Sequence, residues 1–130
     1  VTLRDGEDLT IVATGLTVSI AMEAAELLQK DGISARVLNI HTIKPLDTEI
    51  IARAARETGA ILTVEEHSII GGLGDAVCEA VCESCPVPVL RFGMMDEFGR
   101  SGSAAKLLEM YGFTAENFAA LAKKAVGLKK

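Results

Sequence analysis

Side chains that could do chemistry are concentrated in one stretch of the sequence, residues 64–85. Near its start stand Glu65, Glu66 and His67, which could transfer protons, because carboxylates and imidazoles are common general acids and bases in enzymes. A glycine turn at residues 71–74 follows, and its backbone N–H groups could bind a phosphate. The stretch ends in three cysteines, whose thiolates could ligate a metal. The elements that position these groups decide which chemistry is possible.

The acid–base candidates Glu65, Glu66 and His67 directly follow a predicted strand at residues 61–64. Ligands of α/β proteins bind at the carboxyl ends of parallel strands, so the location suits a site. Successive residues at a strand end point in different directions, however, and no nucleophile or second motif accompanies these three. We therefore expect His67 to be a hydrogen-bonded residue at the rim, and we assign no catalytic residue to this chain.

The glycines Gly71, Gly72 and Gly74 lie in the turn between that strand and a predicted helix at residues 73–84. A helix N-terminus offers free N–H groups and a favourable dipole to an anion. No Lys-Ser or Lys-Thr pair follows as in a P-loop, and the spacing differs from the dinucleotide-binding G-x-G-x-x-G motif. Two interpretations stay open: small residues that let the helix pack close to the sheet, which the pattern favours, or an anion-binding turn.

The cysteines Cys78, Cys82 and Cys85 have the spacing C-x3-C-x2-C, which is associated with four-iron clusters. Here the spacing is that of a helix, in which positions i, i+4 and i+7 place all three on one stripe. We therefore interpret them as small core residues or semi-buried thiols. A zinc site would need a fourth ligand from a histidine, and neither histidine has a suitable spacing. We expect no metal ligand in this chain.

Strand and helix patterns alternate along the chain, which predicts an α/β fold. The expected strands are at residues 9–14, 35–40, 61–64 and 87–92, and the expected helices at 18–30, from Pro45 to 58, 73–84, 103–110 and 115–126. Such an alternation forces a mostly parallel sheet covered on both faces, so we predict a three-layer α/β/α sandwich of four to five strands. We expect residues 1–8 to be a residual linker, 9–127 the domain and 128–130 a tail.

The composition limits the kinds of partner that this chain can bind. The net charge of −5 leaves no basic surface for nucleic acid, and no apolar run is long enough to span a bilayer. The start at Val1 lacks the features of a signal peptide and looks like a cut in a larger polypeptide, and closely spaced cysteines fit reduced thiols. We expect a cytoplasmic protein.

The apolar content of 49% predicts a homodimer, and the loop 93–102, which contains Phe98 and Arg100, is the candidate partner surface.

Five blocks stand in order along the chain: DLTIVATG at 8–15, TIKPLD at 42–47, VEEHSIIGGLG at 64–74, DEFGRSG at 96–102 and YGFT at 111–114. Together they resemble the C-terminal domain of transketolases, in particular the split transketolases made of two chains. Deoxyxylulose phosphate synthases and the beta subunits of 2-oxo acid dehydrogenases carry similar domains. The HSII block and the FGRSG loop favour the split transketolase interpretation.

The resemblance implies a thiamine-diphosphate enzyme of the pentose phosphate pathway that moves two-carbon ketol units between sugar phosphates. In that family one domain binds the diphosphate and magnesium through a G-D-G motif, and a second holds the pyrimidine ring. The third domain, which this chain resembles, serves assembly and closure.

This sequence has no G-D-G motif. We therefore expect the chain to be inactive alone, to bind no thiamine diphosphate or magnesium, and to work with the missing domains. The alternatives are the C-terminal domain of a related thiamine enzyme, either a deoxyxylulose phosphate synthase or a 2-oxo acid dehydrogenase beta subunit, and a stand-alone anion-binding module. The candidates for anion binding or an interface are Glu65, His67, Gly71, Gly72, Gly74, Phe98 and Arg100.

Overall fold

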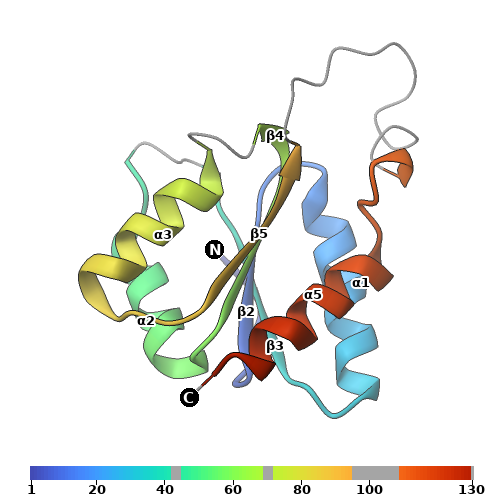
Figure 1. Cartoon of the computed structure of the whole chain (residues 1–130), viewed down its shortest axis with the longest axis horizontal. Coiled ribbons are helices and arrows are strands. Elements are labelled where there is room, and N and C mark those ends of the chain that lie inside the picture. Colours follow the sequence, from blue (N-terminus) through green and yellow to red (C-terminus); the bar gives the residue numbers. More distant parts are fainter. Residues whose placement is uncertain (42–44, 69–71, 95–108, 130) are drawn as a thin grey trace.

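A five-stranded sheet between two layers of helices forms the centre of the molecule (Figure 1). The computed structural model describes residues 1–41, 45–68, 72–94 and 109–129. The strands, in the spatial order β1-β3-β2-β4-β5, are β1 (Thr2–Arg4), β3 (Ala35–Asn39), β2 (Leu9–Ala13), β4 (Ile61–Ser68) and β5 (Val89–Met94). Strands β2 to β5 pair in parallel, and β1 pairs antiparallel with β3. The predicted mostly parallel α/β sandwich is confirmed.

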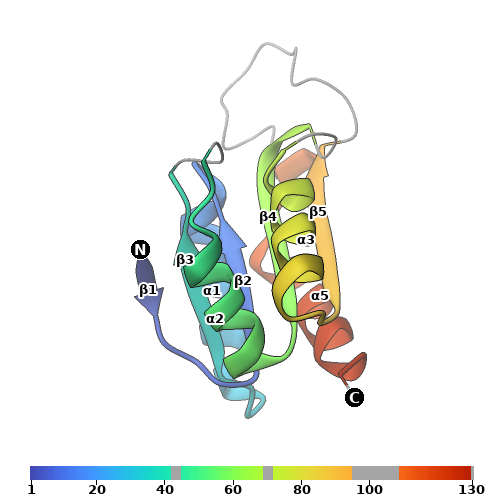
Figure 2. The ribbon, with the colours of Figure 1, turned by 90° about the vertical axis from the view of Figure 1, so that its left-hand side faces the viewer.

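The helices cover both faces of the sheet, which is seen edge-on in Figure 1 and face-on in Figure 2. They are α1 (Thr17–Lys30), α2 (Thr48–Thr58), α3 (Leu73–Ser84) and α5 (Ala115–Gly127). Strand β2 is buried along its whole length, with Leu9, Ile11 and Ala13 facing α1 and α5 and Val12 facing α2 and α3. A central parallel strand needs apolar side chains on both faces, which explains its near-continuous apolar run.

Helix α2 begins where a side chain can cap it. Asp47 accepts a hydrogen bond from the Ile50 N–H at 3.2 Å, so the helix starts at Thr48. The sequence had suggested a start at Pro45. Carboxylate caps satisfy N–H groups that have no partner inside a helix. Gly59, with φ at 76°, ends α2 in the left-handed conformation that glycine adopts without strain.

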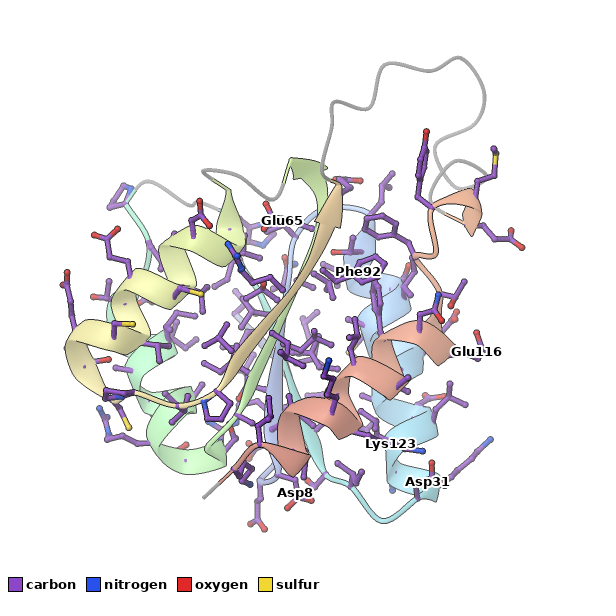
Figure 3. All side chains as sticks on the ribbon, in the orientation of Figure 1. Asp8, Asp31, Glu65, Phe92, Glu116 and Lys123 are labelled. Atoms are coloured by element: carbon purple, nitrogen blue, oxygen red, sulfur yellow. The ribbon has the colours of Figure 1, made fainter. Side chains whose placement is uncertain are left out.

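The face formed by α1 and α5 is held by aromatic packing and one ion pair. Phe92 of β5 contacts Phe113 and Phe118 edge to face, at centroid distances of 4.8 Å and 5.3 Å. Lys123 of α5 pairs with Asp31 at the end of α1 at 2.6 Å (Figure 3). These contacts fix α5 on the sheet beside α1.

The first eight residues belong to the folded unit, which corrects their interpretation as a linker. Strand β1 extends the sheet at the edge of β3, and Gly6 is buried against the backbone of Ala35 and Arg36. At the other end of the chain, Lys129 donates to the Asp8 carbonyl at 2.9 Å. A three-residue strand with polar members carries no periodic signal, so the sequence did not reveal it.

Two expected segments fall largely outside the described residues. Of the predicted helix 103–110, the structure describes Glu109 and Met110, which are helical, and of the loop 93–102 it describes Gly93 and Met94. In the described ranges, no helix is long and apolar enough to cross a membrane.

Candidate functional site

The candidate site lies at the carboxyl edge of the sheet, where β4 ends and α3 begins (Figure 1). Strand β4 runs through Ser68, four residues beyond the predicted end at Val64, so Glu65 and Glu66 are strand residues and not turn residues. Neighbouring strand residues face opposite sides of a sheet. Glu65 therefore points to the α3 side and Glu66 to the α1 side.

Glu65 is a buried carboxylate that caps α3. Its side chain is 2% exposed, and it accepts hydrogen bonds from the backbone N–H of Leu73 at 2.9 Å and of Gly74 at 2.7 Å, one to each carboxylate oxygen. These are the first two residues of α3, and the residue before them, Gly72, supplies no side-chain cap. The negative charge also lies at the positive end of the helix dipole. Glu65 thus performs from β4 the task that a local cap performs in α2.

Glu66 covers the turn between β2 and α1. Its carboxylate accepts a hydrogen bond from the Leu16 N–H at 3.3 Å. The same oxygen would lie 2.0 Å from a Cβ placed on Gly15, whose φ is 56°. A side chain at Gly15 would therefore be strained and would also displace Glu66.

Close packing explains the glycine at the start of α3. A Cβ on Gly74 would lie 2.8 Å from Cδ of Arg91 and 3.1 Å from Oγ1 of Thr63, so any side chain here would force its neighbours to shift. Arg91 of β5 then reaches Asp75 of α3, with 2.5 Å between Nη1 and Oδ1. The first turn of α3 is thus held to β4 by Glu65 and to β5 by Arg91, which supports the packing interpretation of this glycine.

Thr63 is the unusual polar group of the site, and the sequence analysis overlooked it. It is fully buried, and within the described part of the chain its hydroxyl has no hydrogen-bond partner. It lies two residues before Glu65 on the same face of β4, which is the spacing that could have identified it. An unpaired buried hydroxyl costs about 1–3 kcal/mol.

The cysteines do not form the core stripe of α3. Cys82 is exposed, and Cys78 and Cys85 are half-buried, whereas Val77 and Val81 are buried. The interpretation as semi-buried thiols holds for two of the three and is wrong for Cys82. Burial raises the pKa of the Cys78 thiol, despite the opposing effect of the nearby Arg91 guanidinium. The described residues contain no group of three or more His, Cys, Asp or Glu side chains that could hold a metal.

Several predicted site residues lie outside the part that the structure describes. His67 belongs to β4, but its side chain is not described, and Gly71, Phe98 and Arg100 are not described at all. Gly72 is the N-cap residue of α3. Of the seven candidates, the structure therefore brings together Glu65, Gly72 and Gly74, and a role in anion binding or in an interface stays a prediction for all seven.

Residues 1–118 match the family model described as the C-terminal domain of transketolase. A 6-deoxy-6-sulfo-D-fructose transketolase subunit of Clostridium sp. (strain MSTE9) is 51% identical over 114 residues, which are 88% of this chain and 35% of that protein. A 1-deoxy-D-xylulose-5-phosphate synthase of Heliobacterium modesticaldum is 50% identical over 123 residues, 94% of this chain and 19% of that protein. A putative transketolase C-terminal section of Methanocaldococcus jannaschii is 49% identical over 118 residues, 90% of this chain and 36% of that protein.

A solved structure described as a split gene transketolase, inactive beta4 tetramer, superposes with a TM-score of 0.90 at 46% identity. The match covers all of this chain and 42% of that one. The chain thus spans between about a fifth and two fifths of the proteins that it matches. It belongs to the family of transketolase C-terminal domains.

Proposed function

We propose that this chain forms the C-terminal part of a two-subunit transketolase, which transfers two-carbon ketol units between sugar phosphates with thiamine diphosphate and magnesium. Relatives named as a transketolase subunit and as a transketolase C-terminal section support the split arrangement. The cytoplasmic location expected from the sequence and a place in the pentose phosphate pathway belong to the same proposal. The chain would act with the domains that bind the diphosphate and the pyrimidine ring.

We propose that this domain contributes to assembly and not to proton transfer. The observation that supports this proposal is the burial and hydrogen bonding of Glu65. A general acid or base must reach the proton that it transfers. Glu65 lies at the sheet edge where a ligand would bind, but it is 2% exposed and both of its oxygens accept hydrogen bonds from α3. Its carboxylate is therefore engaged in holding the fold.

The described residues of this domain do not fit the cofactor. A diphosphate with magnesium needs oxygen ligands for the metal and N–H or cationic donors for the phosphates. The described residues offer no cluster of three side chains for a metal, and Glu65 already takes the first two N–H groups of α3. We infer that thiamine diphosphate and magnesium bind in the partner domains.

Reconstitution tests the proposal. The purified chain is mixed with a subunit that carries the diphosphate-binding and pyrimidine-binding domains, and ketol transfer is measured with thiamine diphosphate and magnesium. We expect no activity from the chain alone and a clear gain when it is added to the partner. Equal activity of the partner with and without the chain would contradict the proposal. Donor sugars in the assay include a phosphorylated and a sulfonated ketose, since one relative is named for a sulfonated substrate.

A second candidate is the C-terminal domain of a 1-deoxy-D-xylulose-5-phosphate synthase. Its support is the 50% identity to the Heliobacterium modesticaldum enzyme, which differs little from the 51% identity to the sulfosugar transketolase subunit. The same reconstituted mixture can be assayed for 1-deoxy-D-xylulose 5-phosphate. Formation of that product without ketol transfer would favour the synthase over the transketolase.

We also propose that the chain self-associates, as its apolar content suggests. Exposed apolar side chains support this part of the proposal, in particular Leu16, Met110 and Tyr111, which are 49%, 74% and 42% exposed. Exposed apolar area of this kind is often covered in an oligomer. Light scattering is expected to give at least twice the chain mass of 13.7 kDa, and a monomer mass at high concentration would contradict it.

A further inference from the structure

The N-terminus of α3 has the donors of an oxyanion site, and one of the chain's own side chains fills it. We propose that Glu65 is an internal ligand that closes a site for a divalent tetrahedral oxyanion, such as sulfate or phosphate, formed by the N–H groups of Leu73 and Gly74 and the hydroxyl of Thr63. Removal of the carboxylate would open this site. The inference concerns the isolated chain and does not depend on the proposed ketol transfer.

Two of the three donors are seen binding an anion. The Leu73 and Gly74 N–H groups donate to the two Glu65 oxygens at 2.9 Å and 2.7 Å, at the start of a helix of 12 residues. Helix N-termini bind phosphate and sulfate with the same pair of features, free N–H groups and a positive dipole end. Two oxygens of a tetrahedral anion can take the places of the two carboxylate oxygens.

Thr63 supplies an independent sign of a binding site, because its hydroxyl is a buried donor beside the start of α3 that the Glu65 carboxylate does not use. Its Oγ1 is fully buried, has no partner in the described part of the chain, and lies 3.1 Å from where a Cβ of Gly74 would be. Buried hydroxyls are nearly always hydrogen-bonded. A planar carboxylate leaves this donor unused, whereas a tetrahedral anion carries further oxygens that could accept from it.

Tethering explains why Glu65 would keep free anions out. A carboxylate on the neighbouring strand competes within the molecule, and its effective concentration exceeds that of a free ion in solution. It is also 2% exposed, so an outside anion has no access while it stays in place. A domain that works beside phosphorylated sugars would thus not bind them at its own sheet edge.

The test is an amide NMR titration of Glu65→Ala with sodium sulfate, against sodium chloride at equal ionic strength. We expect saturable shifts of the Leu73 and Gly74 amides in the variant, with an affinity at least about tenfold tighter than in the wild type, as the loss of a competing charged hydrogen-bond acceptor implies. The matched control is Asp47→Ala, which removes the carboxylate cap of α2. That cap is exposed, and among the described residues the unpaired buried hydroxyl is that of Thr63 and does not belong to α2, so no comparable affinity is expected there.

Two further measurements keep the proposal open to contradiction. Thr63→Val added to Glu65→Ala is expected to weaken sulfate binding severalfold, because the third donor is gone. If Glu65→Ala is unfolded in chloride, helical circular dichroism should return as sulfate is added. A folded Glu65→Ala without saturable shifts, an unfolded one that sulfate does not restore, or equal binding by the wild type would each overturn the proposal.

Discussion

Charged side chains hold both edges of the sheet, but they do so differently. At the carboxyl edge Glu65 is buried and accepts hydrogen bonds from two backbone N–H groups. At the amino edge Arg36 pairs with Glu57 at 2.8 Å and with Asp5 at 3.3 Å, and the two carboxylates are 45% and 89% exposed. The first arrangement removes a charge from water and the second leaves its partners largely solvated.

A charged side chain contributes more to the stability of this fold where it is buried than where it is exposed. An N–H group left without a partner in the interior loses its hydrogen bond with no water to replace it. When the pair between Arg36 and Glu57 is broken, water can solvate the half-exposed carboxylate. Arg36, whose side chain is 12% exposed, keeps its contacts with Asp5 and the Gly6 carbonyl, so the loss of stability is expected to be small. We therefore expect substitutions at the carboxyl edge to have large effects and those at the amino edge small ones.

The largest effect is expected for Glu65→Ala. The substitution leaves two buried N–H groups and a gap at the start of α3, so the free energy of unfolding should fall by about 3 kcal/mol. Urea denaturation in chloride buffer measures the change. The control is the neighbouring Glu66→Ala, which frees the more accessible Leu16 N–H and should cost about 1 kcal/mol or less. Equal losses in the two variants would show that burial does not separate the two carboxylates.

The next effect is expected for Gly74→Ala. The new Cβ would lie 2.8 Å from Cδ of Arg91, so α3 must move away from β5 or Arg91 must shift, at a cost of about 2 kcal/mol. The control is Gly127→Ala in the last turn of α5, where no atom lies within 4 Å of the added Cβ. Thermal unfolding of both variants checks the prediction, and a Gly74→Ala protein as stable as Gly127→Ala would refute close packing as the reason for this glycine.

The sequence predicted the order of elements well because their signals are local. The bounds of α3 at residues 73–84 agree with the structure, and α5 begins at residue 115 as expected, where Thr114 caps it by accepting from the Asn117 N–H at 3.1 Å. Strand β4 was predicted four residues too short, since its end, Glu65 to Ser68, is polar and lacks the apolar run of a buried strand.

The sequence was enough to predict where the site lies but not what role its residues have. Glu65 was a candidate because it follows a strand, yet its role depends on a contact with Gly74, nine residues away, that only the fold brings about. The prediction that the cysteines lie on the core side of the helix was wrong for a related reason. Cys78 and Cys82 each follow a buried valine by one residue, and periodicity alone does not decide which of two adjacent helical stripes faces the core.

A stabilising effect is expected for Thr63→Val. The substitution keeps the shape of the side chain and removes a buried hydroxyl without a described partner, so the free energy of unfolding should rise by about 1 kcal/mol. The control is Thr10→Val, whose hydroxyl is also buried but lies 2.8 Å from that of Thr58. We expect Thr10→Val to destabilise. Urea denaturation that gives a loss for both threonines would mean that the Thr63 hydroxyl has a stabilising partner.

The smallest effect is expected at the amino edge, and it depends on pH. The Arg36 guanidinium that donates to Glu57 holds the pKa of that carboxyl below its ordinary value of 4.5. A carboxyl with a lowered pKa stabilises the folded protein above its ordinary pKa, and this contribution disappears as the pH falls through the lowered value. Glu57→Gln should therefore be slightly less stable than the wild type at neutral pH, and the difference should vanish in acid.

Urea denaturation at neutral pH and well below pH 4.5 measures this difference, and added salt should shrink it at neutral pH because the Glu57 carboxylate is solvated. Glu26→Gln on α1 is the control, since Glu26 is exposed and has no ion pair with the described residues. If the difference for Glu57→Gln persists in acid, its cause would be a loss of packing and not the loss of the ion pair. A difference as large as that of Glu65→Ala would remove the contrast between the two edges, because an ion pair with a half-exposed carboxylate would then stabilise the fold as much as a buried cap.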